Sequence, residues 1–118
     1  LGDVYKRQAL VGFGINVAQF SLLRHVQRLD RPSITCLAEA MGLERSTLGR
    51  NLKVLQAEGL VRLADGEDQR NRVVLLSEAG RACLDAAYPA WQQAQAQLVK
   101  RLGEGQRDEL VRLLEQLA

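Results

Sequence analysis

The chain is poor in the residues on which several protein classes depend. It has two cysteines, one histidine and two prolines among 118 residues. A disulfide scaffold needs more cysteines. A zinc site needs more ligands than Cys36, Cys83 and His25, which form no CxxC motif and lie far apart in the sequence. No apolar run approaches the roughly 20 residues that span a bilayer. We therefore expect no disulfide framework, metal, cofactor or membrane span, and we expect a cytoplasmic protein.

A large excess of charge is also absent. The 16 basic and 14 acidic residues give a net charge of +2, whereas a strongly basic chain would indicate nucleic-acid binding. The charge is uneven, because residues 1–72 hold 11 basic and 8 acidic side chains and residues 73–118 hold 5 and 6. A hydrophobic content of 47% is typical of a single folded domain of this length. DNA binding would therefore depend on where the basic residues lie, and not on the net charge.

Helical periodicity dominates what is present. Apolar residues spaced three and four apart indicate amphipathic helices. Asn16, Ser33 and Ser77 are good N-caps, and Gly42 and Gly59 are placed to end a helix. These signals predict helices over about 17–29, 34–41, 45–58 and 78–102, and a last helix that carries Leu110–Leu117.

Two short extended segments interrupt the helices. Residues 60–63 alternate loosely, residues 72–76 are β-branched and apolar, and the stretch between them is polar and rich in turn formers. These segments predict a β-hairpin with a charged tip. The expected fold class is therefore mainly α with a small β-hairpin (α+β).

Residues 33–59 have the spacing of a helix-turn-helix, in which a short turn that holds a glycine joins two helices. The inward face of the second helix is expected to be Leu48, Leu52 and Leu55. At 3.6 residues per turn the opposite face then presents Ser46, Arg50 and Lys53, without an acid. Arginine in this place suits bidentate binding to guanine in the major groove. The alternative is that these cations form an ordinary solvated helix face.

Six segments in order carry a family resemblance. They are Val17–Phe20, Leu37–Leu43, Glu44–Arg50, Leu55–Val61, Asp68–Arg70 and Leu76–Arg81. From about Gly14 onward the chain resembles the MarR family of winged helix-turn-helix transcription regulators. The resemblance implies a DNA-binding lobe over residues 14–81 and C-terminal dimerisation helices over residues 82–118. Residues 1–8 resemble adaptor-derived read-through, so we expect residues 1–13 to be a non-native leader followed by the remnant of a first helix.

The resemblance also implies roles for individual residues. Residues 45–58 match the recognition helix and residues 61–76 match the wing, in which Arg70 reaches the minor groove and Asp68 holds the wing in shape. A plain surface pair of Asp68 and Arg70 is the alternative. The residues expected to bind DNA are Ser33, Thr35, Arg45, Ser46, Thr47, Arg50, Asn51, Lys53, Arg70 and Arg72.

The same resemblance implies a regulator that works as a homodimer on a pseudo-palindromic operator. Members are most often repressors, and many release DNA when a small aromatic or phenolic effector binds. We expect only Ala9–Phe13 to remain of the family's first helix, and we therefore expect two apolar seams to lack a cover. Packing of the helices on each other within the chain is the alternative. The residues expected to form the dimer are Leu84, Ala87, Trp91, Leu98, Leu110, Leu113, Leu114 and Leu117.

Two other functions compete with DNA binding. A winged-helix protein-interaction module would present a docking face that is more apolar and less cationic. An enzyme would need a nucleophile–base pair, a metal set or a phosphate loop, and none is evident in the sequence. Redox sensing by Cys36 or Cys83 stays open, although inert cysteines are more common. His25 is expected on a helix surface or at an interface.

Overall fold

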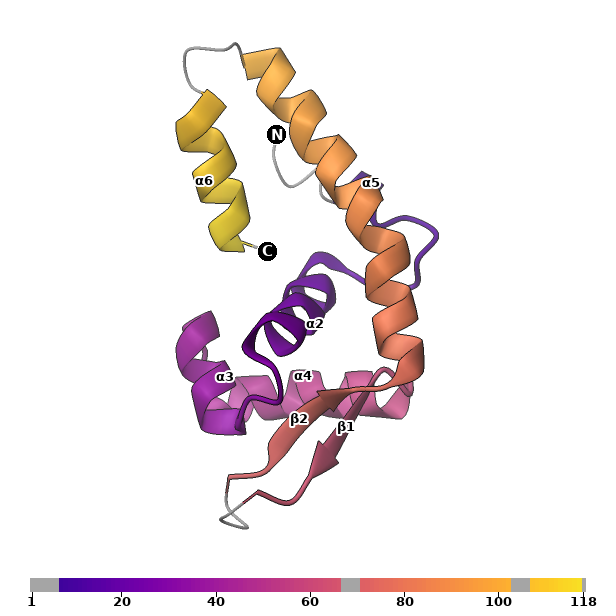
Figure 1. Cartoon of the computed structure of the whole chain (residues 1–118), viewed down its shortest axis with the longest axis vertical. Coiled ribbons are helices and arrows are strands. Elements are labelled where there is room, and N and C mark those ends of the chain that lie inside the picture. The colour runs from indigo at the N-terminus through magenta and orange to yellow at the C-terminus, as the bar shows by residue number, and fades with distance from the viewer. Residues whose placement is uncertain (1–6, 67–70, 103–106, 118) are drawn as a thin grey trace.

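Figure 1 presents the computed structural model of the chain, which describes residues 7–66, 71–102 and 107–117. The elements are α2 (Val17–Leu29), α3 (Ile34–Met41), α4 (Arg45–Ala57), β1 (Val61–Ala64), β2 (Val73–Leu76), α5 (Glu78–Leu102) and α6 (Arg107–Leu117). The first three helices and the hairpin form one lobe, α5 leads away from it, and α6 folds back beside α5. The expected fold class, mainly α with an antiparallel hairpin, is confirmed.

α2 begins and ends at the residues that the sequence predicts. Asn16 Oδ1 accepts from Gln19 N and Gln19 Oε1 accepts from Asn16 N, both at 2.8 Å, which is a capping box. At the other end Asp30 and Arg31 have positive φ angles of 54° and 58°. They precede Pro32, which disfavours a helical residue before it. The chain therefore turns sharply between α2 and α3.

The turn between α3 and α4 is the predicted glycine turn. Gly42 has a φ of 66°, in the left-handed region, and its N–H donates to the carbonyl groups that end α3. α4 ends at Ala57 rather than at the predicted Glu58, which is its C-cap. A one-residue difference at a helix end is ordinary fraying. α3 packs against α4, so the two helices form the expected helix-turn-helix.

A third segment, which the sequence did not predict, pairs with strand β2 of the hairpin. Along the edge of β2 that faces away from β1, Val74 N donates to Pro32 O at 2.9 Å and Ile34 N donates to Arg72 O at 3.0 Å. The segment before α3 therefore extends the sheet by one short bridge and fastens the hairpin to the helix-turn-helix. The register between the two strands pairs Val61 with Leu76, Arg62 with Leu75, Leu63 with Val74 and Ala64 with Val73.

One hydrophobic core joins the lobe to α5. Its buried side chains come from the segment before α2, from α2 to α4, from both strands and from α5. Phe20 of α2 and Trp91 of α5 lie with their ring centroids 5.0 Å apart and their planes tilted by 42°. Two aromatic side chains of this size bury a large apolar area, so they anchor α5 to the lobe. α5 continues through Pro89 without a break in the helix.

The apolar seam of α5 lies inside the chain, which corrects the expectation of a seam without a cover. Leu84, Ala87 and Trp91 are at most 2% exposed and belong to the core. The reason is that α2 packs on this face of α5, and helical periodicity does not distinguish such a neighbour from a second chain. Leu98 and Leu114 are also buried, and α5 and α6 contact each other.

The apolar face of α6 is covered only in part. Leu113 and Leu117 are 52% and 54% exposed, and the side chain of Leu110 lies outside the described part of the structure. Before α2, Val11 is 76% exposed, whereas Leu10 is buried in the core. Large exposed apolar side chains therefore remain on α6 and on the segment that precedes α2.

His25 corrects a further expectation, because it is not on the surface of α2. Its side chain is buried, and Nδ1 lies 2.7 Å from the carbonyl oxygen of Ser21 one turn earlier. A backbone carbonyl at this distance satisfies the ring nitrogen and makes its burial tolerable. His25 is therefore part of the packing of α2.

The start of α5 lies against the turn that leads into β1. Ser77 caps α5 by accepting from Gly80 N at 3.0 Å, and Ser77 N donates to Leu60 O at 3.1 Å. A Cβ atom on Gly80 would collide with the same carbonyl oxygen of Leu60. Glycine at position 80 therefore allows the helix to approach this close.

Candidate nucleic-acid interface

The outer face of α4 carries the side chains that the sequence predicts there. The inward face, Leu48, Leu52 and Leu55, is at most 1% exposed. On the opposite face Ser46, Arg50 and Lys53 are exposed, and Arg45 is exposed at the start of the helix. Ser46 lies in the first turn, where hydroxyl and backbone N–H groups suit phosphate oxygens. α4 therefore presents a cationic and hydroxyl-bearing face to solvent.

Arg50 is the cation at the centre of this face. Its Nη2 donates to Thr47 Oγ1 at 3.5 Å, across one turn of α4. Thr47 and Asn51 are half-buried and flank the exposed face. Val54 is 48% exposed beside them, and an apolar side chain in this place suits a thymine methyl group. The face thus combines hydrogen-bond donors with one apolar patch.

The start of α3 is occupied by contacts within the chain. Ser33 Oγ accepts from Cys36 N at 3.0 Å, as a helix N-cap. Thr35 N donates to Asn71 Oδ1 at 3.3 Å. Asn71 was not among the predicted site residues, and no local sequence signal marks it because its partner lies far away along the chain. The structure thus adds Asn71 to the residues that surround the predicted interface.

The wing is described only at its base. Asp68 and Arg70, the two residues predicted at its tip, lie outside the described residues. Arg72 Nη2 donates to Leu63 O at 3.3 Å, and Arg72 Nε lies 3.8 Å from Asp65 Oδ1. Arg72 therefore ties the two strands together at the wing's base, and its contact with DNA stays a prediction.

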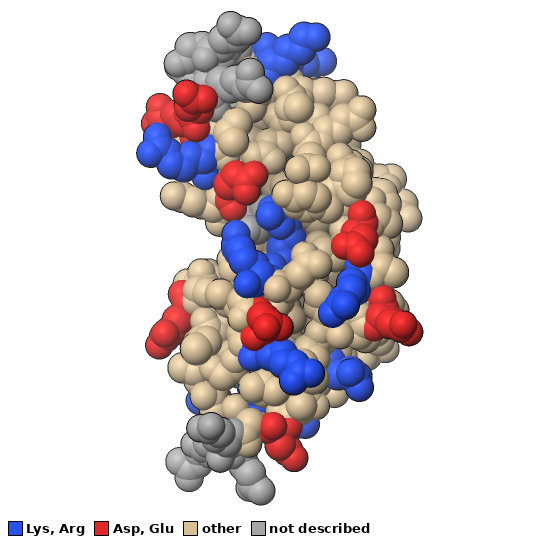
Figure 2. All heavy atoms as spheres, viewed as in Figure 1, with Lys and Arg blue, Asp and Glu red and all other residues tan. Residues whose placement is uncertain are grey.

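Figure 2 shows one face of the molecule, on which Lys and Arg side chains are interspersed with Asp and Glu. A mixture of this kind creates no large field of one sign. This arrangement agrees with the net charge of +2. The case for nucleic-acid binding therefore rests on the local arrangement of α4 and the wing.

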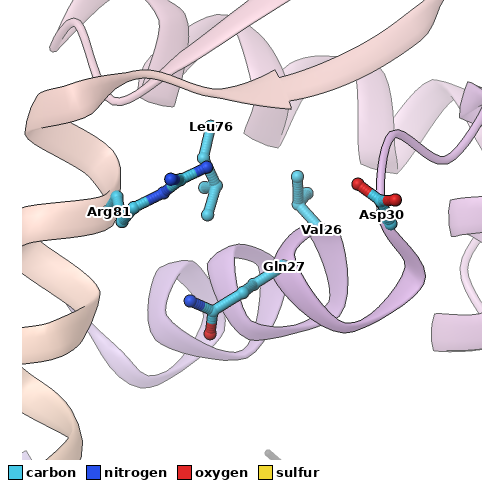
Figure 3. Close-up of a pocket in the computed structure, with 5 residues that line it drawn as sticks. All are labelled: Val26, Gln27, Asp30, Leu76 and Arg81. Carbon is cyan, nitrogen blue, oxygen red and sulfur yellow. The ribbon is translucent and has the colours of Figure 1, made fainter.

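A pocket lies between α2, β2 and the start of α5. It is lined by Val26, Gln27, Asp30, Leu76 and Arg81, and its volume is about 210 Å³. Figure 3 shows Arg81 entering from α5 on one side and Asp30 at the end of α2 on the other. Among the described residues neither side chain forms an ion pair. The pocket therefore holds one guanidinium and one carboxylate, which form no ion pair with each other, beside two apolar side chains.

The two cysteines differ in their surroundings. Cys36 is exposed, whereas Cys83 on α5 is half-buried with its Sγ 3.7 Å from Phe13 O. Burial raises the pKa of the Cys83 thiol, and the negative charge of Glu58 raises this pKa further. A raised pKa keeps a thiol protonated and unreactive, so Cys83 is the less suitable redox sensor.

Other kinds of site are not found in the described part of the chain. Residues 7–66, 71–102 and 107–117 contain no group of three His, Cys, Asp or Glu side chains that could hold a metal ion. Within the same ranges no helix is both long and apolar enough to cross a membrane.

The comparisons with known proteins agree with this geometry. A family model described as the MarR family matches residues 13–71, half of the 118 residues. No curated protein sequence matches the chain significantly. Among solved structures, the M. tuberculosis transcriptional regulator MosR in complex with DNA is 34% identical with a TM-score of 0.78. That match covers 97% of this chain and 84% of the M. tuberculosis chain.

Two structures with lower sequence identity to this chain also share its fold. A mutant of the E. coli protein MarR complexed with operator DNA is 23% identical with a TM-score of 0.85, over 98% of this chain and 84% of that chain. BpsR from Bordetella bronchiseptica is 22% identical with a TM-score of 0.82, over 98% of this chain and 89% of that chain. The DNA binding of BpsR is regulated by 6-hydroxynicotinic acid.

Proposed function

The chain belongs to the MarR family of transcription regulators, and from this membership we propose that it binds a specific double-stranded DNA sequence in the cytoplasm and represses transcription there. The observation that carries the proposal is the outer face of α4. Arg50 and Lys53 are exposed on it, directly opposite three buried leucines. A helix held this way by its helix-turn-helix partner is able to enter a major groove.

Recognition in this proposal divides between two grooves. On α4, Arg50 donates to guanine N7 and O6, and Ser46, Thr47 and the start of the helix contact phosphates. The wing carries Arg70 into the adjacent minor groove, where a guanidinium is attracted by a narrow, electronegative groove. Asp68 restrains the wing. Base contacts then select the sequence, and phosphate contacts hold the register.

We propose further that two chains bind one pseudo-palindromic operator. Two copies of α4 would enter successive major grooves about 34–36 Å apart, one turn of B-DNA. The half-exposed Leu113 and Leu117 of α6, with the exposed Val11, are apolar side chains that a second copy would cover. The dimer surface in this proposal is therefore α6 with the segment before α2, and not the seam of α5.

The pocket between α2, β2 and α5 supports a response to a small ligand. Arg81 suits a carboxylate or phenolate, and Val26 and Leu76 suit the flat apolar part of an aromatic ring. BpsR, a structural relative, is described as regulated by an aromatic acid. We propose that an aromatic or phenolic acid binds this pocket, bridges the lobe to α5 and changes the distance between the two copies of α4.

A selection from random duplex DNA, followed by titration of the selected site at several salt concentrations, tests the proposal. A specific regulator is expected to enrich an inverted repeat and to bind it with a steep salt slope, because phosphate contacts release counterions. Equal affinity for random and selected DNA would contradict DNA regulation. That result would favour the alternative of a winged-helix module that binds another protein.

A further inference from the structure

We propose that Asn71 is a positioning residue for DNA recognition, which sets where the wing lies relative to α4. Its side chain accepts a hydrogen bond from Thr35 N in the first turn of α3. This inference rests on the proposed function, since a wing that reads DNA is its premise. It adds a residue that contacts no base and yet determines which bases the wing reaches.

The first turn of α3 depends on the wing for its hydrogen bonds. The first backbone N–H groups of a helix have no partner within the helix and must find acceptors elsewhere. In α3, two of the three donors in this turn are satisfied by residues next to β2, and one by the N-cap. The acceptors are Arg72 O for Ile34 N at 3.0 Å, Asn71 Oδ1 for Thr35 N at 3.3 Å and Ser33 Oγ for Cys36 N at 3.0 Å.

Asn71 is the contact to α3 that lies farthest toward the hairpin tip among the described residues. The backbone bonds along the edge of β2 end at Arg72, and the side chain of Asn71 adds one more bond beyond them. Beyond the end of β1, Gly66 approaches Asn71, since a Cβ on Gly66 would lie 2.6 Å from Asn71 O. Asn71 is therefore bonded to α3 on one side and lies close to the backbone of Gly66 on the other.

The bond between Asn71 and Thr35 joins the two parts that read DNA. α3 packs against α4, so a wing fastened to α3 has a fixed distance from the major-groove helix. Without this bond the wing's base keeps its backbone pairing, but the direction of the hairpin beyond Arg72 is less constrained. The expected consequence is a loss of discrimination among the base pairs that flank those read by α4.

The experiment measures discrimination at the flanking base pairs, which lie under the wings, separately from discrimination at the core base pairs, which α4 reads. The site selected from random DNA by the unmodified protein is prepared in two versions, which differ only in whether the base pairs under the wings are A·T or G·C. Arginine prefers the narrow minor groove of A·T tracts. The unmodified protein is therefore expected to bind the A·T version more tightly. The measured quantity is the Kd for the G·C version divided by the Kd for the A·T version, so a value above one is a preference for A·T flanks.

Asn71→Ala is expected to lower this ratio roughly three- to ten-fold, the range that one hydrogen bond contributes, while discrimination at the core base pairs stays unchanged. Asn71→Asp keeps the acceptor for Thr35 N and is expected to retain the ratio, although its added charge weakens binding to both versions alike. Asn16→Ala is the matched control. It also removes a hydrogen bond at a helix start, here that of α2, so it tests whether loss of stability alone changes the ratio.

The outcomes distinguish this inference from the proposed function. A protein that selects no site overturns both. A selected site without a preference among flanks, or an Asn71→Ala variant that keeps the preference, overturns the inference and leaves the proposed function intact. An Asn16→Ala variant that loses the preference to the same degree also overturns it, because the effect would then follow from stability. Loss in Asn71→Ala with retention in Asn71→Asp and Asn16→Ala supports it.

Discussion

Arg50 is the residue from which we expect most of the base preference of α4. Arg50→Ala is predicted to weaken binding to the selected site by about 1–3 kcal/mol, because a bidentate contact to guanine contributes about that much discrimination. Sequence preference at that base pair should relax at the same time. Competition binding with single-base variants of the site measures both effects.

The control for Arg50 is Arg112→Ala, which removes an exposed cation from α6. It is expected to leave base preference unchanged. If Arg112→Ala relaxes the preference as much as Arg50→Ala does, the assignment of Arg50 to base contact is wrong.

Gly80 is the residue at which a single methyl group is expected to be most costly. Gly80→Ala places a Cβ against the carbonyl oxygen of Leu60, and forced overpacking costs about 1–3 kcal/mol. The midpoint of thermal unfolding should therefore fall by several degrees. Gly49→Ala is the control, because no atom outside the local backbone of α4 lies within 4 Å of its Cβ position and alanine is the better helix former. A Gly80→Ala protein as stable as Gly49→Ala would contradict the close approach.

Cys83 makes the stability depend on pH. Its pKa is raised by burial and by Glu58, so the folded chain favours the protonated thiol. The free energy of unfolding is then expected to fall as pH rises through the ordinary thiol pKa toward the raised one. Alkylation rates against pH, in a Cys36→Ser background, should give a higher midpoint for folded than for unfolded protein. Glu58→Gln should reduce the difference, and equal midpoints would refute the shift.

At the scale of elements, local signals predicted the helices and the hairpin well. The capping box at Asn16, the left-handed Gly42 and the period of the leucines on α4 act over a few residues, so a single sequence displays them. The bridge between Ser33 and Val73 has no such signal, because its two sides are brought together only when the helix-turn-helix docks. Arg50 was predicted as an exposed residue of the interface because local helical periodicity places it opposite the leucines. Asn71 was missed because its partner, Thr35, is far away along the chain.

α6 is the element on which dimerisation is predicted to depend. Leu113→Ser with Leu117→Ser removes two half-exposed apolar side chains, and in a two-fold dimer each substitution counts twice. Each of these half-exposed leucines has about half of the roughly 1.5–3 kcal/mol of a fully buried leucine left to gain, and a dimer covers two from each chain. The dimer dissociation constant is therefore expected to rise roughly 100- to 10,000-fold. Sedimentation at several concentrations measures it. Glu115→Ser, on the same helix, is the control, and equal dissociation constants for all three proteins would exclude this surface.

At the scale of the whole molecule, the sequence did not determine which element packs against each apolar face. The leucines, alanine and tryptophan of the α5 seam were correctly identified as apolar and helical. Their periodicity serves an intramolecular contact with Phe20 as well as it serves a second chain. Leu10 is the opposite case. It follows a segment without helical periodicity, so no pattern predicts its burial, and it is nevertheless buried in the core.

The bridge from the segment before α3 to β2 also affects how the protein avoids aggregation. Strands with an unpaired edge are templates for pairing with other chains. β2 is bonded to β1 along one edge, and at Val73 and Val74 it is bonded to the segment around Ser33 on the other edge. This end of its apolar run therefore offers no free edge to a neighbour. The outer edge of β1 has no strand beside it among the described residues, but β1 is only four residues long and carries the exposed Arg62. A short strand that bears a charge resists intermolecular strand addition, so the hairpin can project into solvent without recruiting further chains.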